Sequence, residues 1–367
     1  MASSRHRRGE TSGLPRRLGP LPRLVARCLG AALATMLAAS PLPAQEPGPA
    51  ASLAASDVEA FADSFFARYL REYPYPSLAV AVVAGDSVLF LKGYGTEDGQ
   101  RPVDPSSTVF NIASISKLVV ATAAMQLVEQ GAVSLDDDIE PRLGGVRLIG
   151  SGPEVTLRHL LTHTSGLEGP FLRDVVADPG LLVPLRQYFT EHPPRRGRPP
   201  GEEIRYSNYA MALAGYLIEQ VSSEPFQDYV ERHLFAPLGM TRSSFRQPPP
   251  EPLTTRVATA GAGRVPDAVL PYPAGSMVST PQDMARFLIA HLNGGRTGSE
   301  RILTEAGVGL MHARQWSADP RVPGVGLGFF ESAMGGEPGL FHTGARVHFS
   351  LLYLFPERQV GLFVVQS

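Results

Sequence analysis

A serine and a lysine three residues apart give the sharpest chemical signal in the sequence. They lie in the stretch Ser114-Ile115-Ser116-Lys117, at the start of a helix predicted from Ile115 to Gln130. Residues three apart share one face of a helix, so the Lys117 amine is expected within reach of the Ser114 hydroxyl. A serine hydroxyl becomes a strong nucleophile when a base takes its proton, and an amine can be that base only if its pKa falls.

The lysine content of the chain supports this interpretation. Among 33 Lys and Arg residues, only Lys92 and Lys117 are lysines. Arginine does not release its proton in proteins, whereas lysine can. The free N–H groups at a helix start also stabilise negative charge near a serine there. The alternative, on these four residues alone, is that Ser114 merely caps the helix and Lys117 is an exposed charge.

A second segment, Tyr206-Ser207-Asn208, precedes a helix predicted from Ala210 to Val221. The tyrosine oxygen could act as a partner base for Lys117 or pass a proton to a leaving group. The Asn208 amide offers a donor and an acceptor, which suits a substrate amide. Taken alone, an ordinary turn explains this tripeptide.

A third segment, His342-Thr343-Gly344, lies in a strand-like stretch. Its glycine would let a substrate backbone come close, and His342 would place a polar group beside the nucleophile. The Ala345 N–H could join the Ser114 N–H in an oxyanion hole. Taken alone, a bulged strand explains this segment.

These three segments, in this order, resemble the motifs of the penicillin-recognising serine hydrolases. The sequence is similar to the branch that contains class C β-lactamases, D-alanyl-D-alanine carboxypeptidases, D-aminopeptidases and related esterases. The resemblance runs from about residue 60 to the C-terminus. Four further stretches are typical of that branch, namely Phe110–Ala113, Leu160–Leu167, Leu234–Met240 and Gly275–Met284.

The resemblance implies an α/β (α+β) fold in which helices flank an antiparallel sheet and a mostly helical domain is inserted. It implies Ser114 as the acylated nucleophile, with Lys117 and Tyr206 sharing proton transfer. His163 and Ser165 belong to a structural signature of the branch and receive no catalytic role. The predicted substrate-binding set is Asn208, His342, Thr343, Gly344 and Ala345.

Two features depart from the pattern of the family. Class C β-lactamases usually carry lysine at the position of His342, whereas histidine is more usual among peptidase and esterase relatives. A dedicated antibiotic-destroying enzyme is therefore the less favoured member of the branch. Relatives also have a helix after the last strand, whereas this sequence stops at Ser367. Part of the strand Val360–Val365 is therefore expected to lack its cover, unless the sequence is a fragment or the sheet is completed differently.

The order of the elements predicts how the chain is organised. Strand-like runs lie near both ends, and helical stretches with Pro-rich loops lie between them. We predict a sheet domain from residues 57–125 and 266–367, with an inserted helical domain at 126–265. Strands are expected at Leu78–Ala84, Ser87–Tyr94, Val325–Phe330, Leu340–Thr343, Val347–Phe355 and Val360–Val365. A hairpin turn is expected at Gly85-Asp86, and helix starts at Asp57 and Thr280.

The first residues are expected to be a targeting signal rather than part of the fold. Residues 1–44 hold seven Arg and one Glu, then an apolar run from Cys28 to Ala39 and small residues ending at Ala44. This run is shorter than a membrane-spanning helix needs. Cleavage after Ala44 would export the chain to the periplasm or beyond, with residues 45–56 as a linker. A disordered or membrane-tethering tail is the alternative.

Composition excludes several classes of protein. The net charge of −2 gives no basic excess for nucleic acid, and one Cys excludes a disulfide scaffold or a multi-cysteine metal site. The motifs Gly-x-Ser-x-Gly and His-Glu-x-x-His are both absent, which argues against a Ser-His-Asp hydrolase of the α/β type and against a zinc peptidase. The sequence thus predicts a secreted serine hydrolase, without metal or cofactor, acting on an ester, a D-amino-acid peptide or a β-lactam. Its partners would be small-molecule or peptide substrates, with peptidoglycan as one candidate source. A catalytically inactive cell-wall-binding protein of the same fold is the alternative, and a metal-dependent hydrolase is remote.

Overall fold

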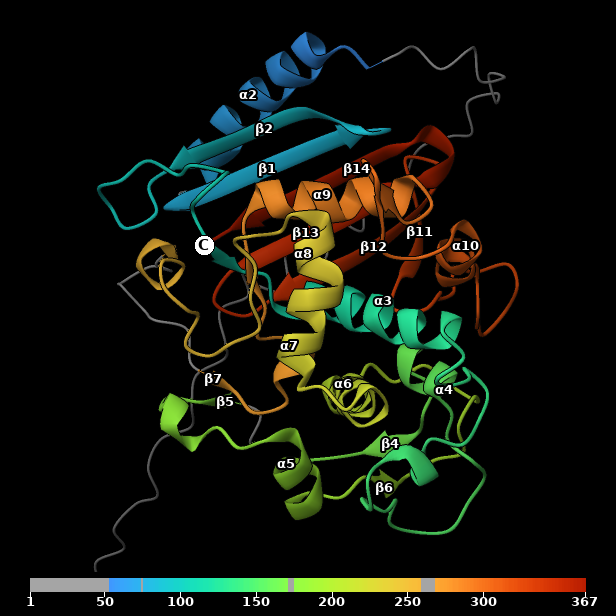
Figure 1. Ribbon diagram of the computed structural model, residues 1–367. Helices are drawn as coiled ribbons and strands as arrows, with labels where there is room; N and C mark the ends of the chain where they lie inside the picture. The colour runs from blue at the N-terminus through green and yellow to red at the C-terminus, as the bar shows by residue number, and fades with distance from the viewer. Residues whose placement is uncertain (1–52, 74, 171–174, 259–267) are drawn as a thin grey trace, which may run out of the picture. The chain divides into compact units, whose positions relative to one another are not determined.

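A six-stranded antiparallel sheet joins the two ends of the described chain (Figure 1). The computed structural model describes residues 53–73, 75–170, 175–258 and 268–367. The pairing of the first strand with the last brings Leu78 opposite Gln366, so the two ends of the described chain meet in one sheet. The strands run in the order β11 (Phe330–Met334), β12 (Glu337–Ala345), β13 (Phe349–Phe355), β14 (Val360–Gln366), β1 (Ser77–Ala84) and β2 (Ser87–Gly95). The predicted sheet from both ends of the chain is therefore confirmed.

Strand β1 is buried on both faces, which explains its continuous apolar sequence. Ala79, Ala81 and Val83 belong to the main core, whereas Leu78 and Val80 pack into a smaller cluster on the other face. The predicted turn at Gly85 joins β1 to β2, and its φ of 56° is one that glycine adopts without strain.

Two helices cover the two faces of the sheet. Helix α2 (Ala55–Glu72) packs on β2, and its Ala62 joins the smaller cluster. Helix α9 (Pro281–Leu292) packs on β1 and β14, and the Thr280 side chain caps it, as predicted, by accepting from the Asp283 N–H. Helix α2 begins two residues before Asp57, so the end of the predicted linker is helical. Residues 45–52 of that linker and the predicted signal lie outside the described residues.

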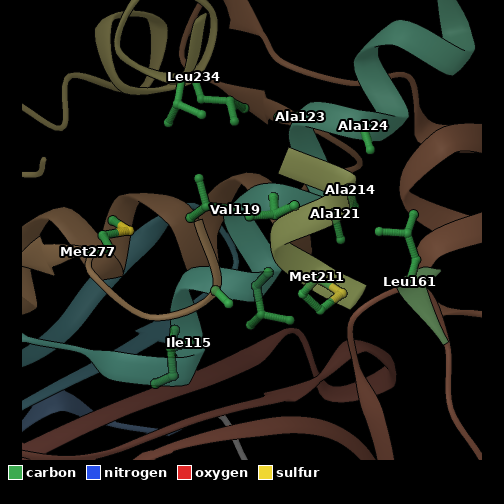
Figure 2. Close-up of a cluster of buried hydrophobic side chains, with 14 of the residues drawn as sticks. Ile115, Val119, Ala121, Ala123, Ala124, Leu161, Met211, Ala214, Leu234 and Met277 are labelled. Carbon is green, nitrogen blue, oxygen red and sulfur yellow. The ribbon is translucent and has the colours of Figure 1, made fainter. Parts of the chain in front are cut away.

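Helix α3 (Ser116–Glu129) runs through the interior and packs against α6 (Asn208–Ser222). Every residue of α3 from Ser116 to Leu127 is buried, so the helix is apolar on nearly all sides. Figure 2 shows small side chains such as Ala121 and Ala214 at this contact, beside Met211. Small residues let the two helices approach closely, and this fixes the start of α3 relative to the start of α6.

The remaining elements are short and lie mostly between α3 and α9. They include helices α4 (Leu157–Leu161), α5 (Leu185–Glu191), α7 (Phe226–Val230), α8 (Ala236–Leu238) and, after α9, α10 (Glu305–His312). Two-residue strands form the pairs β3 (Phe110–Asn111) with β8 (Val278–Ser279), β4 (Leu167–Glu168) with β6 (Arg195–Arg196), β5 (Val175–Val176) with β7 (Ala268–Val269), and β9 (Arg296–Thr297) with β10 (Glu300–Arg301). Ser52–Ser367 forms one compact unit, and the predicted domain boundaries stay a prediction. In the described segments, no helix has the length and apolar character needed to cross a bilayer.

The strand expected at Val325–Phe330 is wrong. Val325 makes only isolated bridges to Trp316 and Phe330, and the regular strand β11 begins at Phe330. The reason is a tight turn in which the Gly326 N–H bonds to the Phe329 carbonyl and Gly328 adopts a φ of 83°. The last strand, β14, alternates buried with half-buried residues, and none of them is exposed.

Candidate active site

Ser114 lies on a strained turn between strand β3 and helix α3. The sequence places it at the start of the α-helix, but the structure puts it in a short 3-10 turn, Ala113–Ile115, just before α3. Ala113 has a φ of 48°, which is uncommon for a residue other than glycine. Such strain persists only where the surroundings hold it.

Hydrogen bonds to residues 275–277 hold this turn in place. The buried Ser116 hydroxyl donates to the Ala113 carbonyl at 2.5 Å and accepts from the Met277 N–H at 3.2 Å. The Asn111 side-chain amide donates to the Ser276 and Met277 carbonyls at 3.4 Å. The turn that carries Ser114 is thus fixed by its own chain neighbours and by the strand β8 region.

Lys117 lies beneath Ser114 and is completely buried. Its Nζ is 2.8 Å from the Ser114 Oγ and 2.6 Å from the Ala274 carbonyl oxygen. The same Nζ lies 4.9 Å from the centroid of the Tyr206 ring. The structure therefore brings Ser114, Lys117 and Tyr206 together as the sequence predicts, although Tyr206 is remote from the other two in the chain.

Tyr206 stands in the loop that leads into helix α6, and its hydroxyl hydrogen-bonds with Ser114. Although 48% of the residue is exposed, burial around the hydroxyl raises the pKa of Tyr206 to about 12, and the bond to Ser114 offsets part of that rise. The side chain is therefore a neutral phenol at pH 7. It can donate a proton, and it is not a standing phenolate base.

His163 positions Tyr206, a role that the sequence analysis does not assign. Its carbonyl accepts from the Arg205 N–H at 2.8 Å and its Nδ1 accepts from the Ser207 N–H at 3.2 Å, so it holds the chain on both sides of Tyr206. The two rings lie 4.5 Å apart between centroids. Burial lowers the pKa of His163 well below its ordinary value, which keeps Nδ1 available as an acceptor.

An open cleft of about 510 Å³ lies over Ser114. The described residues that line it include four predicted site residues besides Ser114 and Tyr206, namely Asn208, His342, Thr343 and Ala345. Asn208 is the first residue of α6, and the other three lie in β12. Ser114 and Ala345 thus line one cleft, and their proposed pairing as an oxyanion hole stays a prediction.

Gly344 has a different role from the one expected. It does not line the cleft, and a Cβ at this position would lie well under 3.0 Å from the Ile112 carbonyl oxygen and the Ser350 Oγ. The close approach that needs glycine is thus made by the protein's own backbone, two residues before Ser114. Gly344 therefore seats β12 against the nucleophile turn.

Two aromatic residues that the sequence analysis does not single out complete the cleft. Phe330 and Phe341 come from the paired strands β11 and β12, with ring centroids 6.0 Å apart. Phe330 also lies against His163, with ring centroids 5.9 Å apart. Both residues sit at ends of apolar runs, a signal too common to mark a site by itself. In the segments that the structure describes, no three His, Cys, Asp or Glu side chains are grouped to hold a metal ion.

Comparison with known proteins gives relatives along most of the chain. The chain is 27% identical over 325 residues to the D-alanyl-D-alanine-carboxypeptidase/endopeptidase AmpH of Escherichia coli (strain K12), covering 83% of this chain and 84% of that protein. It is 28% identical over 310 residues to penicillin-binding protein 4 of Amycolatopsis lactamdurans, covering 78% and 79%. It is 29% identical over 233 residues to the putative penicillin-binding protein PbpX of Bacillus subtilis (strain 168), covering 62% of this chain but only 57% of that protein.

Solved structures share the fold. The D-alanine carboxypeptidase AmpC of Burkholderia cenocepacia aligns with a TM-score of 0.69 at 23% identity, covering 85% of this chain and 94% of that one. The octameric penicillin-binding protein homologue of Pyrococcus abyssi aligns with a TM-score of 0.68 at 24% identity, covering 84% and 73%. The sequence profile of the Beta-lactamase family matches residues 62–367. With a Ser114–Lys117 pair in a cleft of this fold and a family match over most of its length, the chain belongs to the Beta-lactamase family.

Proposed function

We propose that this protein is a serine hydrolase that forms an acyl-enzyme on Ser114 and then hydrolyses it. The observation that supports this most strongly is the buried Lys117 Nζ, 2.8 Å from the Ser114 Oγ at the floor of an open cleft. The names of two relatives, a D-alanyl-D-alanine-carboxypeptidase/endopeptidase and a penicillin-binding protein, agree with acyl transfer on a serine.

In the proposed acylation step, Lys117 in its uncharged form takes the Ser114 proton. An uncharged amine has two N–H donors and one lone pair, so one N–H can stay on the Ala274 carbonyl while the lone pair accepts the proton. Removal from water favours an uncharged amine over an ammonium, and Lys117 is fully buried. The Ser114 oxygen then bonds to the substrate carbonyl carbon, whose oxygen becomes the oxyanion.

The neutral Tyr206 hydroxyl is suited to the second half of that step. The oxyanion collapses, the bond to the leaving group breaks, and the leaving group takes a proton from Tyr206, which recovers one from the Lys117 ammonium. Water then attacks the acyl carbon and loses a proton to the same groups. The bond from that carbon to the Ser114 Oγ breaks, the Oγ takes the proton back, and the acid leaves. The hydrogen bond between Tyr206 and Ser114 and the 4.9 Å from the Lys117 Nζ to the Tyr206 ring support this route.

The substrate is an ester, a D-amino-acid peptide or a β-lactam amide, and we place the ester and the peptide ahead of the β-lactam. The Asn208 amide and the Thr343 hydroxyl line the cleft, where they can orient the reacting carbonyl group. His342 supplies no cation there at neutral pH, because burial lowers its pKa to about 3.

A panel of substrates tests the proposal. The protein is assayed with p-nitrophenyl esters, nitrocefin and D-alanyl peptides, beside Ser114→Ala and a control, Ser151→Ala, at an exposed serine outside the cleft. We expect turnover of at least one ester or peptide by the wild type and Ser151→Ala, and none by Ser114→Ala. Binding without turnover by the wild type would favour the inactive cell-wall-binding alternative instead.

We also propose that the protein is exported after cleavage following Ala44. The support is the basic, apolar and small-residue order of residues 1–44. Expression of the full chain in a bacterial host, with mass spectrometry of the extracytoplasmic fraction, should find a mature N-terminus at Gln45. A product that keeps residues 1–44 and stays in the cytoplasm would contradict this.

A further inference from the structure

The cleft over Ser114 is lined by uncharged groups. Among the described residues that line it, none carries a charge at neutral pH, because Tyr206 has a pKa of about 12 and His342 a pKa of about 3. One wall is aromatic and is made by Phe330, Phe341 and Tyr206, with the Phe330 and Tyr206 ring centroids 6.3 Å apart. Such a wall favours apolar groups of a ligand.

The hydrogen bonds of His342 fix which of its ring nitrogens carries the proton. The Nδ1 lies 2.7 Å from the Thr343 carbonyl oxygen, which can only accept, so Nδ1 is the protonated nitrogen of the neutral ring. The Nε2 is then a bare lone pair. It is buried and has no hydrogen-bond partner, in a residue that is only 2% exposed. The neutral ring therefore offers neither a positive charge nor a free N–H group to a ligand in the cleft.

A ligand carboxylate beside His342 would find no positively charged partner among the described residues that line the cleft. The His342 ring has no free N–H group to donate to it, since Nδ1 already bonds to the Thr343 carbonyl, and a charge removed from water is stable only when it is paired. Arg205 is half-exposed and lies near Glu203 and Glu168, and neither Arg205 nor Arg346 lines the cleft. Lys117 lies below Ser114 against the Ala274 carbonyl. The neutral Asn208 and Thr343 side chains suit a carbonyl or hydroxyl group instead.

We propose that the substrate of this site is an uncharged ester or amide, with an apolar or aromatic group against Phe330 and Phe341 and beside the neutral His342. It carries no free carboxylate at that position. This rests on the proposed function, because it describes the substrate of the Ser114 nucleophile. Peptides with a free C-terminal carboxylate and β-lactams with a ring carboxylate are then poor substrates.

Two boronic acids that bond reversibly to a serine oxygen test the substrate class without turnover. Phenylboronic acid and 3-carboxyphenylboronic acid differ only in the carboxylate, and calorimetry gives the Kd of each. For the wild type we expect phenylboronic acid to bind about tenfold more tightly or better. In His342→Lys the added cation should shift that ratio at least about tenfold toward the carboxylated acid. Phe330→Ala should weaken phenylboronic acid, whereas Phe61→Ala, at a 70% exposed residue of α2, should not.

The outcomes separate the two proposals. Equal or tighter binding of the carboxylated acid by the wild type would overturn the uncharged-substrate inference and leave the Ser114 hydrolase intact. Binding of either acid that persists in Ser114→Ala, or no binding of either acid to the wild type, would refute the hydrolase proposal and this inference with it. The wild-type ratio decides the matter even if His342→Lys fails to fold.

Discussion

A methyl group added at Gly344 should damage both stability and catalysis. The new Cβ would lie well under 3.0 Å from the Ile112 carbonyl and the Ser350 Oγ, and the carbonyl belongs to the backbone just before the Ser114 turn. Strand β12 and this turn must therefore separate by about 1 Å. Overpacking of this kind costs about 1–3 kcal/mol of the free energy of unfolding. A displacement of about 1 Å between nucleophile and substrate costs about 100-fold in kcat/KM.

The matched control for Gly344→Ala is Gly309→Ala in helix α10. A Cβ at Gly309 meets nothing within 4 Å, and the residue lies in a helix, where alanine is about 0.5–1 kcal/mol more favourable than glycine. Urea unfolding gives the free energies, and hydrolysis of the best ester in the panel gives kcat/KM. We expect Gly309→Ala to be as active as the wild type and slightly more stable. A Gly344→Ala protein with unchanged stability and unchanged kcat/KM would refute the claim that this glycine seats β12 against the nucleophile turn.

Three further predictions concern the buried bases of the protein. Lys117→Ala and Lys117→Arg should both lose most activity, because alanine has no base and arginine keeps the charge but cannot accept the Ser114 proton. Lys92→Arg, at the only other lysine, should keep full activity, and a fully active Lys117→Arg would contradict the base role. His163→Phe loses the acceptor for the Ser207 N–H, so its kcat should fall about tenfold with KM nearly unchanged, whereas His163→Asn keeps an acceptor, tolerates the φ of 59° and should recover part of the lost kcat. Equal kcat values for His163→Phe and the wild type would show that the hydrogen bond has no positioning role. Burial lowers the pKa of six histidines, and in five of them it falls far enough that the unfolded state binds more protons below pH 6.5; these five are His163, His291, His312, His342 and His348. The free energy of unfolding should therefore fall by about 1.4 kcal/mol for each of the five between pH 7.5 and 5.5 in urea unfolding, and a flat profile would contradict this.

The features of the site that depend on local geometry could be predicted from the sequence. The three-residue spacing of Ser114 and Lys117 fixes their contact, since a helical turn places such residues on one face. The contribution of Tyr206 is predicted only from the family motif. Its loop lies 89 residues after Lys117 (206 − 117), and only tertiary packing brings it to the site. The paired end strands of the sheet followed from apolar runs bounded by turn residues.

The remaining features depend on contacts that no residue pattern encodes. His163 adopts a left-handed backbone conformation and bonds on both sides of Tyr206, and neither property is visible in its sequence neighbours. The sequence predicts that Gly344 makes room for a substrate backbone, whereas in the structure it makes room for the Ile112 carbonyl. The apolar run from Val325 to Phe330 predicts a strand, but its two glycines, Gly326 and Gly328, form a turn.

Labelling with a fluorophosphonate tests the central claim most directly, since the Ser114 oxygen should bond to phosphorus as fluoride leaves. Intact-mass and peptide mass spectrometry should then find one adduct per chain, located on Ser114 in the wild type and absent from Ser114→Ala. Labelling should also slow sharply in Lys117→Ala, because the base that activates the hydroxyl is gone. An unlabelled wild type, an adduct on another residue, or equal labelling of Ser114→Ala would contradict the account.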